Sequence, residues 1–309
     1  MASLKAIRKR IGSVKSTQKI TRAMKMVAGA RLNRAQQRIV ELRPYAVKTQ
    51  EALSEIVSRT VHAIEDGETH ESQDGHAPAL DPSEATHPLL VRRSEQRVLL
   101  LVLTSDRGLC GAFNSNLNKT AEREYRERTA NGQDVRVVVI GRKGRDYLTR
   151  RSIPITPMPN VWDKLSYETS KRIGDLVLTP FLKGEVDAIY VVYSEFKSAM
   201  SQQVAVEPLL PVPPVPDSDG IDSGDFLFEP SRTALLEHLA PLYVDISILR
   251  ALYESMASEL GARMTAMDAA TKNATEMIDR LTLEYNKARQ AAITKELMEI
   301  IGGSEALKE

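Results

Sequence analysis

The chain has 309 residues, in which 42 Lys and Arg nearly balance 41 Asp and Glu. No stretch approaches the roughly 18–20 apolar residues that a membrane-spanning helix needs, and no apolar secretory segment follows the basic N-terminal residues. The single cysteine, Cys110, excludes a disulfide within the chain and is typical of a protein from a reducing compartment.

The N-terminal fifty residues carry a strong local charge. Residues 1–48 contain thirteen Lys and Arg and only one acid, Glu41. A solvated helix face normally mixes Lys with Glu four residues apart, and this stretch lacks that compensation. The excess charge predicts an acidic partner, which could be nucleic acid, an anionic membrane or an acidic protein surface.

Apolar residues recur every three or four positions along residues 4–60, a pattern typical of a helix wound on a second helix. Gln18, Thr21 and Lys25 interrupt this repeat midway. Pro44 is expected to kink the helix. Twelve of the seventeen a and d heptad positions are apolar: Leu4, Ile7, Ile11, Val14, Ala28, Leu32, Ala35, Ile39, Leu42, Ala46, Leu53 and Ile56.

The last eighty residues repeat this pattern. Neither helix is stable alone at such a length, so we expect the two to pair as an antiparallel coiled coil. Fourteen of the seventeen a and d positions from 239 to 295 are apolar: Leu239, Leu242, Ile246, Leu249, Tyr253, Met256, Leu260, Met267, Ala270, Ala274, Met277, Leu281, Ala288 and Ala291.

The middle of the chain has a different composition. Residues 65–88 are acidic without Lys or Arg, as in a flexible linker, and residues 207–230 are rich in proline. Between these two segments, strand and helix patterns alternate, which predicts an open α/β sheet with helices on its faces. The expected strands are 98–103, 135–140, 188–193 and 202–206, and the expected helices are 115–130, 142–150 and 167–183.

These patterns predict an α/β protein, in which a long antiparallel two-helix coiled coil is joined to a Rossmann-like open α/β domain. The expected segments are an N-terminal coiled-coil helix (1–62), an acidic linker (63–95), a globular α/β domain (96–207), a proline-rich connector (208–230) and a C-terminal coiled-coil helix (231–309).

No catalytic, cofactor or metal site stands out. The loop Ser105–Gly111 follows a strand, but its Gly-x-x-Gly spacing matches neither phosphate-binding glycine pattern, and Gly141–Gly144 also suits a plain turn. Cys110 has no neighbouring group that would make it a nucleophile. Four of the five histidines lie in or beside the acidic linker, with a spacing too irregular for a metal site: His62, His70, His76 and His87.

Two other functions remain open at this point. A basic coiled-coil protein could associate with nucleic acid, although no aromatic residue for base stacking precedes Tyr45. The second open function is that of a small nucleotide-dependent α/β enzyme, and the missing phosphate-binding motif argues against it.

Four motifs resemble those of ATP synthase γ subunits, in their bacterial form. The segment Ile11–Arg31, with its run STQKITRAMKMVA, resembles the N-terminal signature of that family, and Thr104–Gly111 resembles the loop after its first strand. Ala266–Ala274 and Tyr285–Glu296 resemble its C-terminal signature. The likeness covers nearly the whole chain, although the acidic linker is longer than in short bacterial forms.

The resemblance implies a non-catalytic rotor shaft, which couples ion flow through a membrane c ring to ATP synthesis or hydrolysis in a head of α and β subunits. It implies four partners, the α, β and ε subunits and the c ring, with no nucleic acid and no cofactor. The implied location is the cytoplasmic face of the bacterial inner membrane, with indirect attachment through the c ring. The implied contacts with β are Arg22, Met24, Lys25, Arg289, Gln290 and Thr294, and those with the c ring are Phe226, Phe228 and Glu229. Because Met24 and Lys25 lie in the polar interruption of the repeat, the resemblance implies that this turn faces β rather than the partner helix.

Overall fold

The computed structural model describes residues 4–65, 87–213 and 232–306. Two helices dominate it, α1 (Leu4–Glu65) and α5 (Arg232–Ala306), and α1 continues without a break through Pro44. The chain forms two compact units. We call Leu32–Ala262 the α/β unit, and Met1–Arg31 with Arg263–Glu309 the coil unit. Both long helices therefore contribute to both units, and each unit is described by itself.

The α/β unit contains a five-stranded sheet in the order β3-β2-β1-β4-β5. Strand β1 is central and parallel to both β2 and β4, β3 is parallel to β2, and β5 is the antiparallel edge strand. The strands are β1 (Arg97–Leu103), β2 (Asp134–Ile140), β3 (Ile155–Met158), β4 (Ala188–Phe196) and β5 (Gln202–Leu210). The three connecting helices are α2 (Phe113–Ala130), α3 (Arg142–Thr149) and α4 (Tyr167–Leu182).

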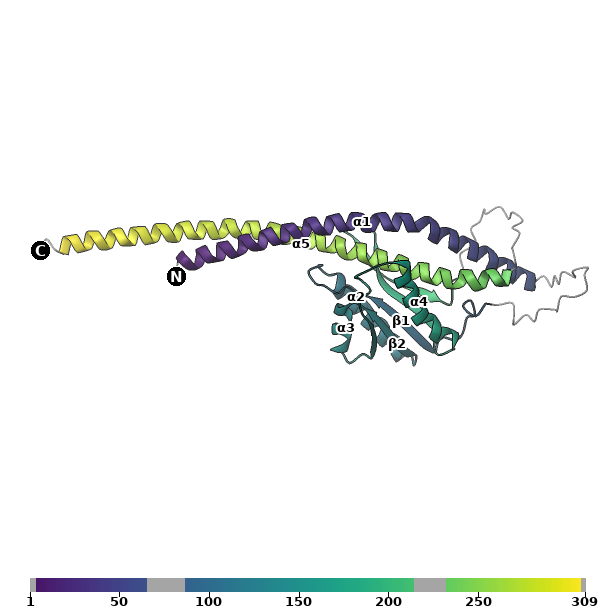
Figure 1. The fold of residues 1–309 in the computed structure, drawn as a ribbon. Coiled ribbons are helices and arrows are strands. Elements are labelled where there is room, and N and C mark those ends of the chain that lie inside the picture. The colour runs from purple at the N-terminus through teal and green to yellow at the C-terminus, as the bar shows by residue number, and fades with distance from the viewer. Residues whose placement is uncertain (1–3, 66–86, 214–231, 307–309) are drawn as a thin grey trace, which may run out of the picture. The chain divides into compact units, whose positions relative to one another are not determined.

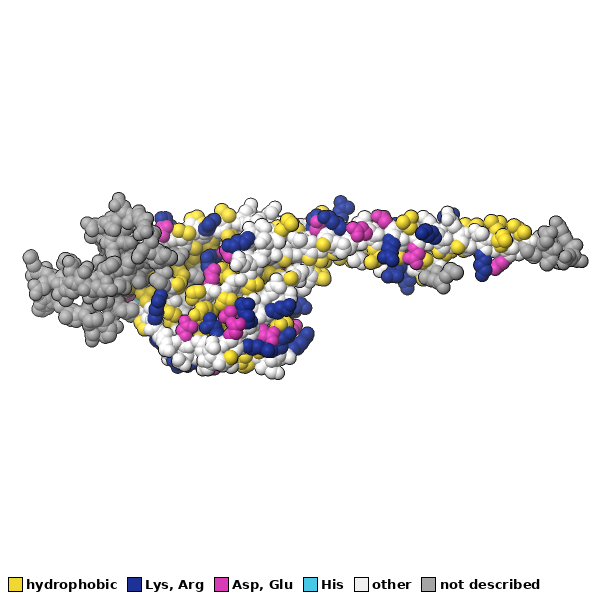
Figure 2. All heavy atoms as spheres, turned by 180° about the vertical axis from the view of Figure 1, so that it is seen from behind, with side chains coloured by type: hydrophobic (Ala, Val, Ile, Leu, Met, Phe, Trp, Pro, Cys, Tyr) yellow, Lys and Arg dark blue, Asp and Glu magenta, His cyan; other side chains and the backbone are white. Residues whose placement is uncertain are grey.

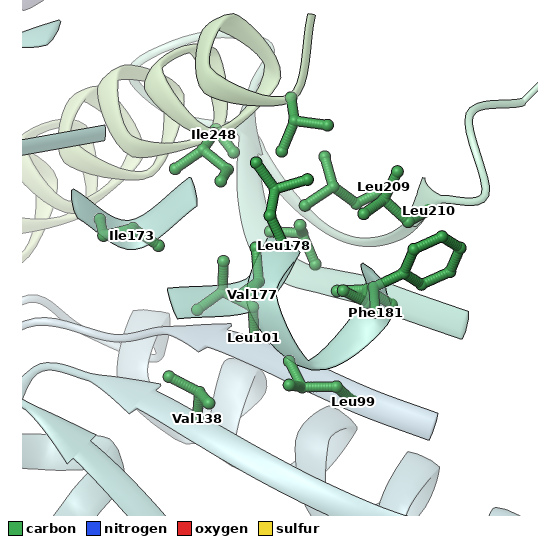
Figure 3. Packing of buried hydrophobic residues seen from close by; sticks show 14 of the residues in the cluster. Leu99, Leu101, Val138, Ile173, Val177, Leu178, Phe181, Leu209, Leu210 and Ile248 are labelled. Atoms are coloured by element: carbon green, nitrogen blue, oxygen red, sulfur yellow. The ribbon is translucent and has the colours of Figure 1, made fainter. Parts of the chain in front are cut away.

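Two apolar cores cover the two faces of this sheet, which explains why β1 is apolar throughout. Leu99 and Leu101 of β1 pack against α4 and α5 on one face, and Figure 3 shows Val177 and Phe181 of α4 above them. Alternate residues of β1 such as Leu100 pack against α2 and α3 on the opposite face. The expected open α/β fold is confirmed, with helices on both faces (Figure 1).

The observed elements correct the expectations for three strands, and the first is β4, which ends at Phe196 rather than at residue 193. Strand β3 was not expected, and β5 does not end before Pro208 but runs on to Leu210. Pro208 lies opposite Tyr190 on the edge strand, beside an irregularity in the ladder. An edge position with a bulge is where a strand accommodates a residue without an N–H.

In the coil unit, the two helices lie side by side in opposite directions, and the end of α5 continues beyond the N-terminus of α1 (Figure 1). The heptad prediction for α1 is confirmed, since every described a and d position from Leu4 to Leu53 is buried or half-buried. The prediction for α5 is partly wrong. Met267 and Leu281 are buried as expected, but Met277 and Ala291 are exposed, and Thr271 and Ile278 face inward instead.

Candidate functional site

Three backbone N–H groups in the loop after β1 and at the start of α3 donate to side chains of the chain itself. The Asn114 side chain accepts a hydrogen bond from the Ser105 backbone N–H (3.1 Å) and lies 2.8 Å from the Ser105 hydroxyl. In the first turn of α3, the Arg142 N–H donates to the Asp106 carboxylate (2.9 Å) and the Gly144 N–H to the Thr104 hydroxyl (2.8 Å). The chain's own oxygens thus occupy donors that a phosphate would need.

The described ranges 4–65, 87–213 and 232–306 contain neither a cluster of metal-ligating side chains nor a membrane-spanning helix. There, no three His, Cys, Asp or Glu side chains lie close enough together to hold a metal ion. The histidines His70 and His76 lie outside the described residues, as does the side chain of His62. Over the part of the chain that the structure describes, no helix is both long enough and apolar enough to cross a membrane.

Three polar pairs join α1 to α5 where the sequence interrupts the apolar repeat. The Gln18 amide donates to the Thr275 hydroxyl (2.7 Å), and the Thr21 and Thr271 hydroxyls lie 2.8 Å apart. The third pair is an ion pair. In all three pairs the two residue numbers add to 292 or 293, as an antiparallel coil with a fixed register requires.

The ion pair changes the interpretation of Lys25. Its Nζ lies 2.6 Å from the Asp268 Oδ1, and this contact holds the pKa of Asp268 below its usual value. The expectation that the polar interruption turns away from the partner helix is therefore wrong. Gln18, Thr21 and Lys25 face α5, whereas Arg22 beside them is exposed.

The outer face of α1 in the coil unit is strongly basic. Among the described residues, no acidic side chain lies within ion-pair distance of seven of its cations, and all seven are exposed. Figure 2 shows dark blue Lys and Arg side chains along this unit. The seven cations are Lys5, Arg8, Lys9, Arg10, Lys15, Lys19 and Arg22.

The end of α5 has no α1 partner. By the register of the polar pairs, Leu4 at the start of α1 lies about opposite Arg289, so the last turns of α5 extend past it. Because no partner helix covers these turns, apolar side chains are exposed there. Ile300 is 68% exposed, and some of these side chains are visible near this end in Figure 2. They are Ile293, Leu297, Met298, Ile300 and Ile301. Sequence patterns missed this surface, because the register of the two helices was unknown.

The structure places the expected β-contact residues in two groups. Arg22 is exposed and Met24 half-buried on α1, next to Lys25. Arg289, Gln290 and Thr294 are exposed on α5. The expected c-ring contacts Phe226, Phe228 and Glu229 lie outside the described residues.

Comparisons with known proteins agree along the whole chain. A family model described as ATP synthase matches residues 3–307. The ATP synthase gamma chain of Sorangium cellulosum is 64% identical over 325 aligned positions, and that of Geobacter sp. (strain M21) is 46% identical over 308. Each alignment covers 100% of both chains.

Solved structures share the fold. A chain of the Tetrahymena thermophila mitochondrial ATP synthase central stalk and c ring has a TM-score of 0.56 at 24% identity, covering 81% of this chain and 99% of that one. A chain of the Euglena gracilis mitochondrial ATP synthase has a TM-score of 0.52 at 20% identity, covering 90% of this chain and 95% of that one.

Proposed function

The chain belongs to the ATP synthase gamma-chain family, and from this membership we propose how its surfaces serve a central rotor shaft. Such a shaft couples ion flow through a membrane ring to ATP synthesis or hydrolysis in the head of the enzyme. The observation that carries the proposal is full-length identity of 64% to a curated gamma chain. No comparison supports a nucleic-acid-associated protein.

The asymmetry of the coil unit supports the shaft mechanism. One side of it presents the basic face of α1, whereas α5 carries both acids and bases and continues alone past Leu4. A body with unlike sides makes different contacts with each of several identical subunits around it. It therefore shifts their conformational equilibria differently, and turning it changes which subunit is in which state.

Two groups of residues are proposed to contact β. Arg22 and Met24, with Lys25 beside them, form the first group, for which the exposed cations of α1 favour an acidic partner surface. Arg289, Gln290 and Thr294 form the second group, and all three are exposed polar residues at the point where α1 begins.

The last turns of α5 are proposed to turn inside the head against an apolar surface. Ile293, Leu297 and Ile301 recur at helical spacing and are exposed without a partner helix. Contacts between apolar surfaces lack directional hydrogen bonds, so they suit a part that must turn.

Other parts of the chain are proposed to contact the remaining subunits of the enzyme. The c ring is proposed to bind the segment with Phe226, Phe228 and Glu229, and the α and ε subunits are proposed as further partners. The chain itself is proposed to be non-catalytic and to work on the cytoplasmic face of the bacterial inner membrane. It would attach to this membrane only through the c ring.

Reconstitution with matching α and β subunits tests the function. We expect stable assembly and a large rise in ATP hydrolysis when the full chain is added. Arg22→Glu should weaken this stimulation, since it opposes an acidic surface on β, whereas Lys119→Glu makes the same charge change on the exposed face of α2 and serves as the control. A chain that neither joins the head nor changes its hydrolysis would contradict the proposal.

A further inference from the structure

Apolar packing provides little to fix the rotation of α1 in the middle of the coil unit. Between Val14 and Ala28, the a and d positions of α1 are Gln18, Thr21 and Lys25, so about two heptads have no apolar residue at these positions, and Met24 is the one half-buried apolar side chain in the stretch. A polar residue at such a position costs stability, but it specifies how the helices meet.

The Lys25–Asp268 ion pair can select one rotation of α1. Successive residues of a helix are about 100° apart, so the neighbours Met24 and Met26 lie on either side of Lys25. A rotation by one residue in either direction would bring a methionine against the Asp268 carboxylate. A thioether donates no hydrogen bond, so either rotation would leave Asp268 with only its longer contact to Lys272 on its own helix (3.6 Å).

We infer that Asp268 is a positioning residue, which fixes the rotation of α1 about its own axis by holding Lys25 against α5. Thr271 and Thr275 support it through the hydrogen bonds to Thr21 and Gln18. This arrangement keeps Lys25 inward and leaves Arg22 on the outer surface. This positioning role goes beyond the rotor function, because it gives Lys25 a partner within its own chain. The role applies to the free chain as well as to the assembled enzyme.

Disulfide cross-linking of the full-length chain measures this rotation directly. The Thr21 and Thr271 hydroxyls lie 2.8 Å apart, so the variant T21C/T271C places two thiols together. Ala23 is exposed on the outer side of α1, so A23C/T271C is the matched pair that should not react. Both pairs are made in a C110A background, and cross-linked chains are separated on a non-reducing gel after mild oxidation.

We expect rapid cross-linking of T21C/T271C and almost none of A23C/T271C. Asp268→Ala should slow the first reaction by roughly two- to fivefold, the range that a partly exposed ion pair can supply. The conservative variant Asp268→Glu should restore most of the rate. Lys25→Asp and Asp268→Lys should each slow the reaction, whereas the double variant K25D/D268K should recover it, because the ion pair is re-formed with reversed charges.

Equal cross-linking rates in all of these variants would overturn the inference, provided that circular dichroism shows unchanged helix content. Slowing by Asp268→Ala without recovery in the charge-swapped variant would also overturn it, since the loss would not come from the pair. Neither result bears on the rotor function, because the head is absent from the experiment. A chain that cross-links as expected but fails to assemble with α and β would contradict the proposed function alone.

Discussion

The α/β unit and the coil unit are stabilised in different ways. In the α/β unit, both faces of the sheet are covered, and residues such as Leu101 are fully buried between layers. The coil unit has a single narrow interface, which polar pairs interrupt, and exposes both cations and apolar side chains. The first unit thus encloses its apolar side chains between layers, whereas the second leaves much of its surface for contacts with other proteins.

The largest expected effect is on the core of the α/β unit. Leu101→Ala should lower the free energy of unfolding of this unit by about 4 kcal/mol, since it removes a fully buried side chain and leaves a cavity. Trp162, the only tryptophan, packs against the same core and reports unfolding in urea by its fluorescence. Leu283→Ala, at an exposed position of the coil unit, should leave this transition unchanged. Equal shifts of the urea transition in both variants would contradict the difference in burial between the two units.

A smaller but still large effect is expected at the turn between β2 and α3. Gly141 has a φ of 97°, and a Cβ there would lie 2.0 Å from the Thr104 carbonyl oxygen. Gly141→Ala should destabilise the α/β unit by about 3 kcal/mol, from backbone strain together with this clash. Gly132 has a similar φ of 82° but nothing near its missing Cβ, so Gly132→Ala should cost only about 1–2 kcal/mol. Trp162 fluorescence in urea measures both, and equal costs would mean that the close contact contributes nothing.

The next prediction tests which residues form the interface of the coil unit. Leu281 is 6% exposed and Met277 is 46% exposed, although the sequence pattern placed both at the interface. Leu281→Ala should therefore destabilise the coil by about 2 kcal/mol, and Met277→Ala by less than about 0.5 kcal/mol. Hydrogen exchange of backbone amides in residues 267–288 measures both effects. Faster exchange in the Met277 variant than in the Leu281 variant would contradict the observed helix orientation.

The smallest expected effect contrasts two aspartates with opposite pKa shifts. Burial raises the pKa of Asp245 in the α/β unit, so its folded form binds a proton more readily than its unfolded form does. Relative to Asp245→Asn, the wild-type chain should gain stability as the pH falls from 7 towards 4. Urea unfolding followed by Trp162 fluorescence at several pH values checks this. A difference that stays constant with pH would mean that Asp245 ionises as freely as it does in the unfolded chain.

Asp268 in the coil unit should behave in the opposite way. Hydrogen bonding to Lys25 lowers its pKa from the ordinary 3.8, so its stabilising effect is complete above that pH and is lost as the pH falls through the lowered value. The difference in amide exchange between wild type and Asp268→Asn should stay constant from pH 7 to pH 5, after correction for intrinsic exchange rates. A difference that shrinks within this range would contradict the ion pair.

Much of the fold follows from the sequence because burial leaves a periodic pattern. Strands β1 and β2 were predicted to within one residue, since both faces of the sheet are covered and each strand contains a continuous apolar run, Val98–Leu103 in β1 and Val137–Ile140 in β2. Strand β3 was missed, because it has only four residues, is partly exposed and contains Pro157. Pro208 was taken as a strand end, because sequence alone does not show that β5 is an edge strand.

The coil unit was harder to predict at its polar positions. The apolar inward residues of α1 follow one heptad repeat and were predicted correctly, whereas the polar residues Gln18, Thr21 and Lys25 were not expected to face α5. On α5, Thr271 contacts Thr21 of α1, and the apolar pattern did not predict this polar contact. The role of Lys25 could not be predicted either, since its partner Asp268 lies 243 residues away and only the register brings them together.

Rotation of the chain within the head tests the central claim most directly. Met200, at the tip of the β4–β5 hairpin, is 86% exposed, whereas Cys110 is buried, so Met200→Cys gives one accessible thiol for attachment of a visible probe. With the head fixed to a surface through its β subunits, the account predicts that the probe turns in one direction when ATP is added and stops when it is removed. Steady ATP hydrolysis with a stationary or randomly moving probe would contradict the account.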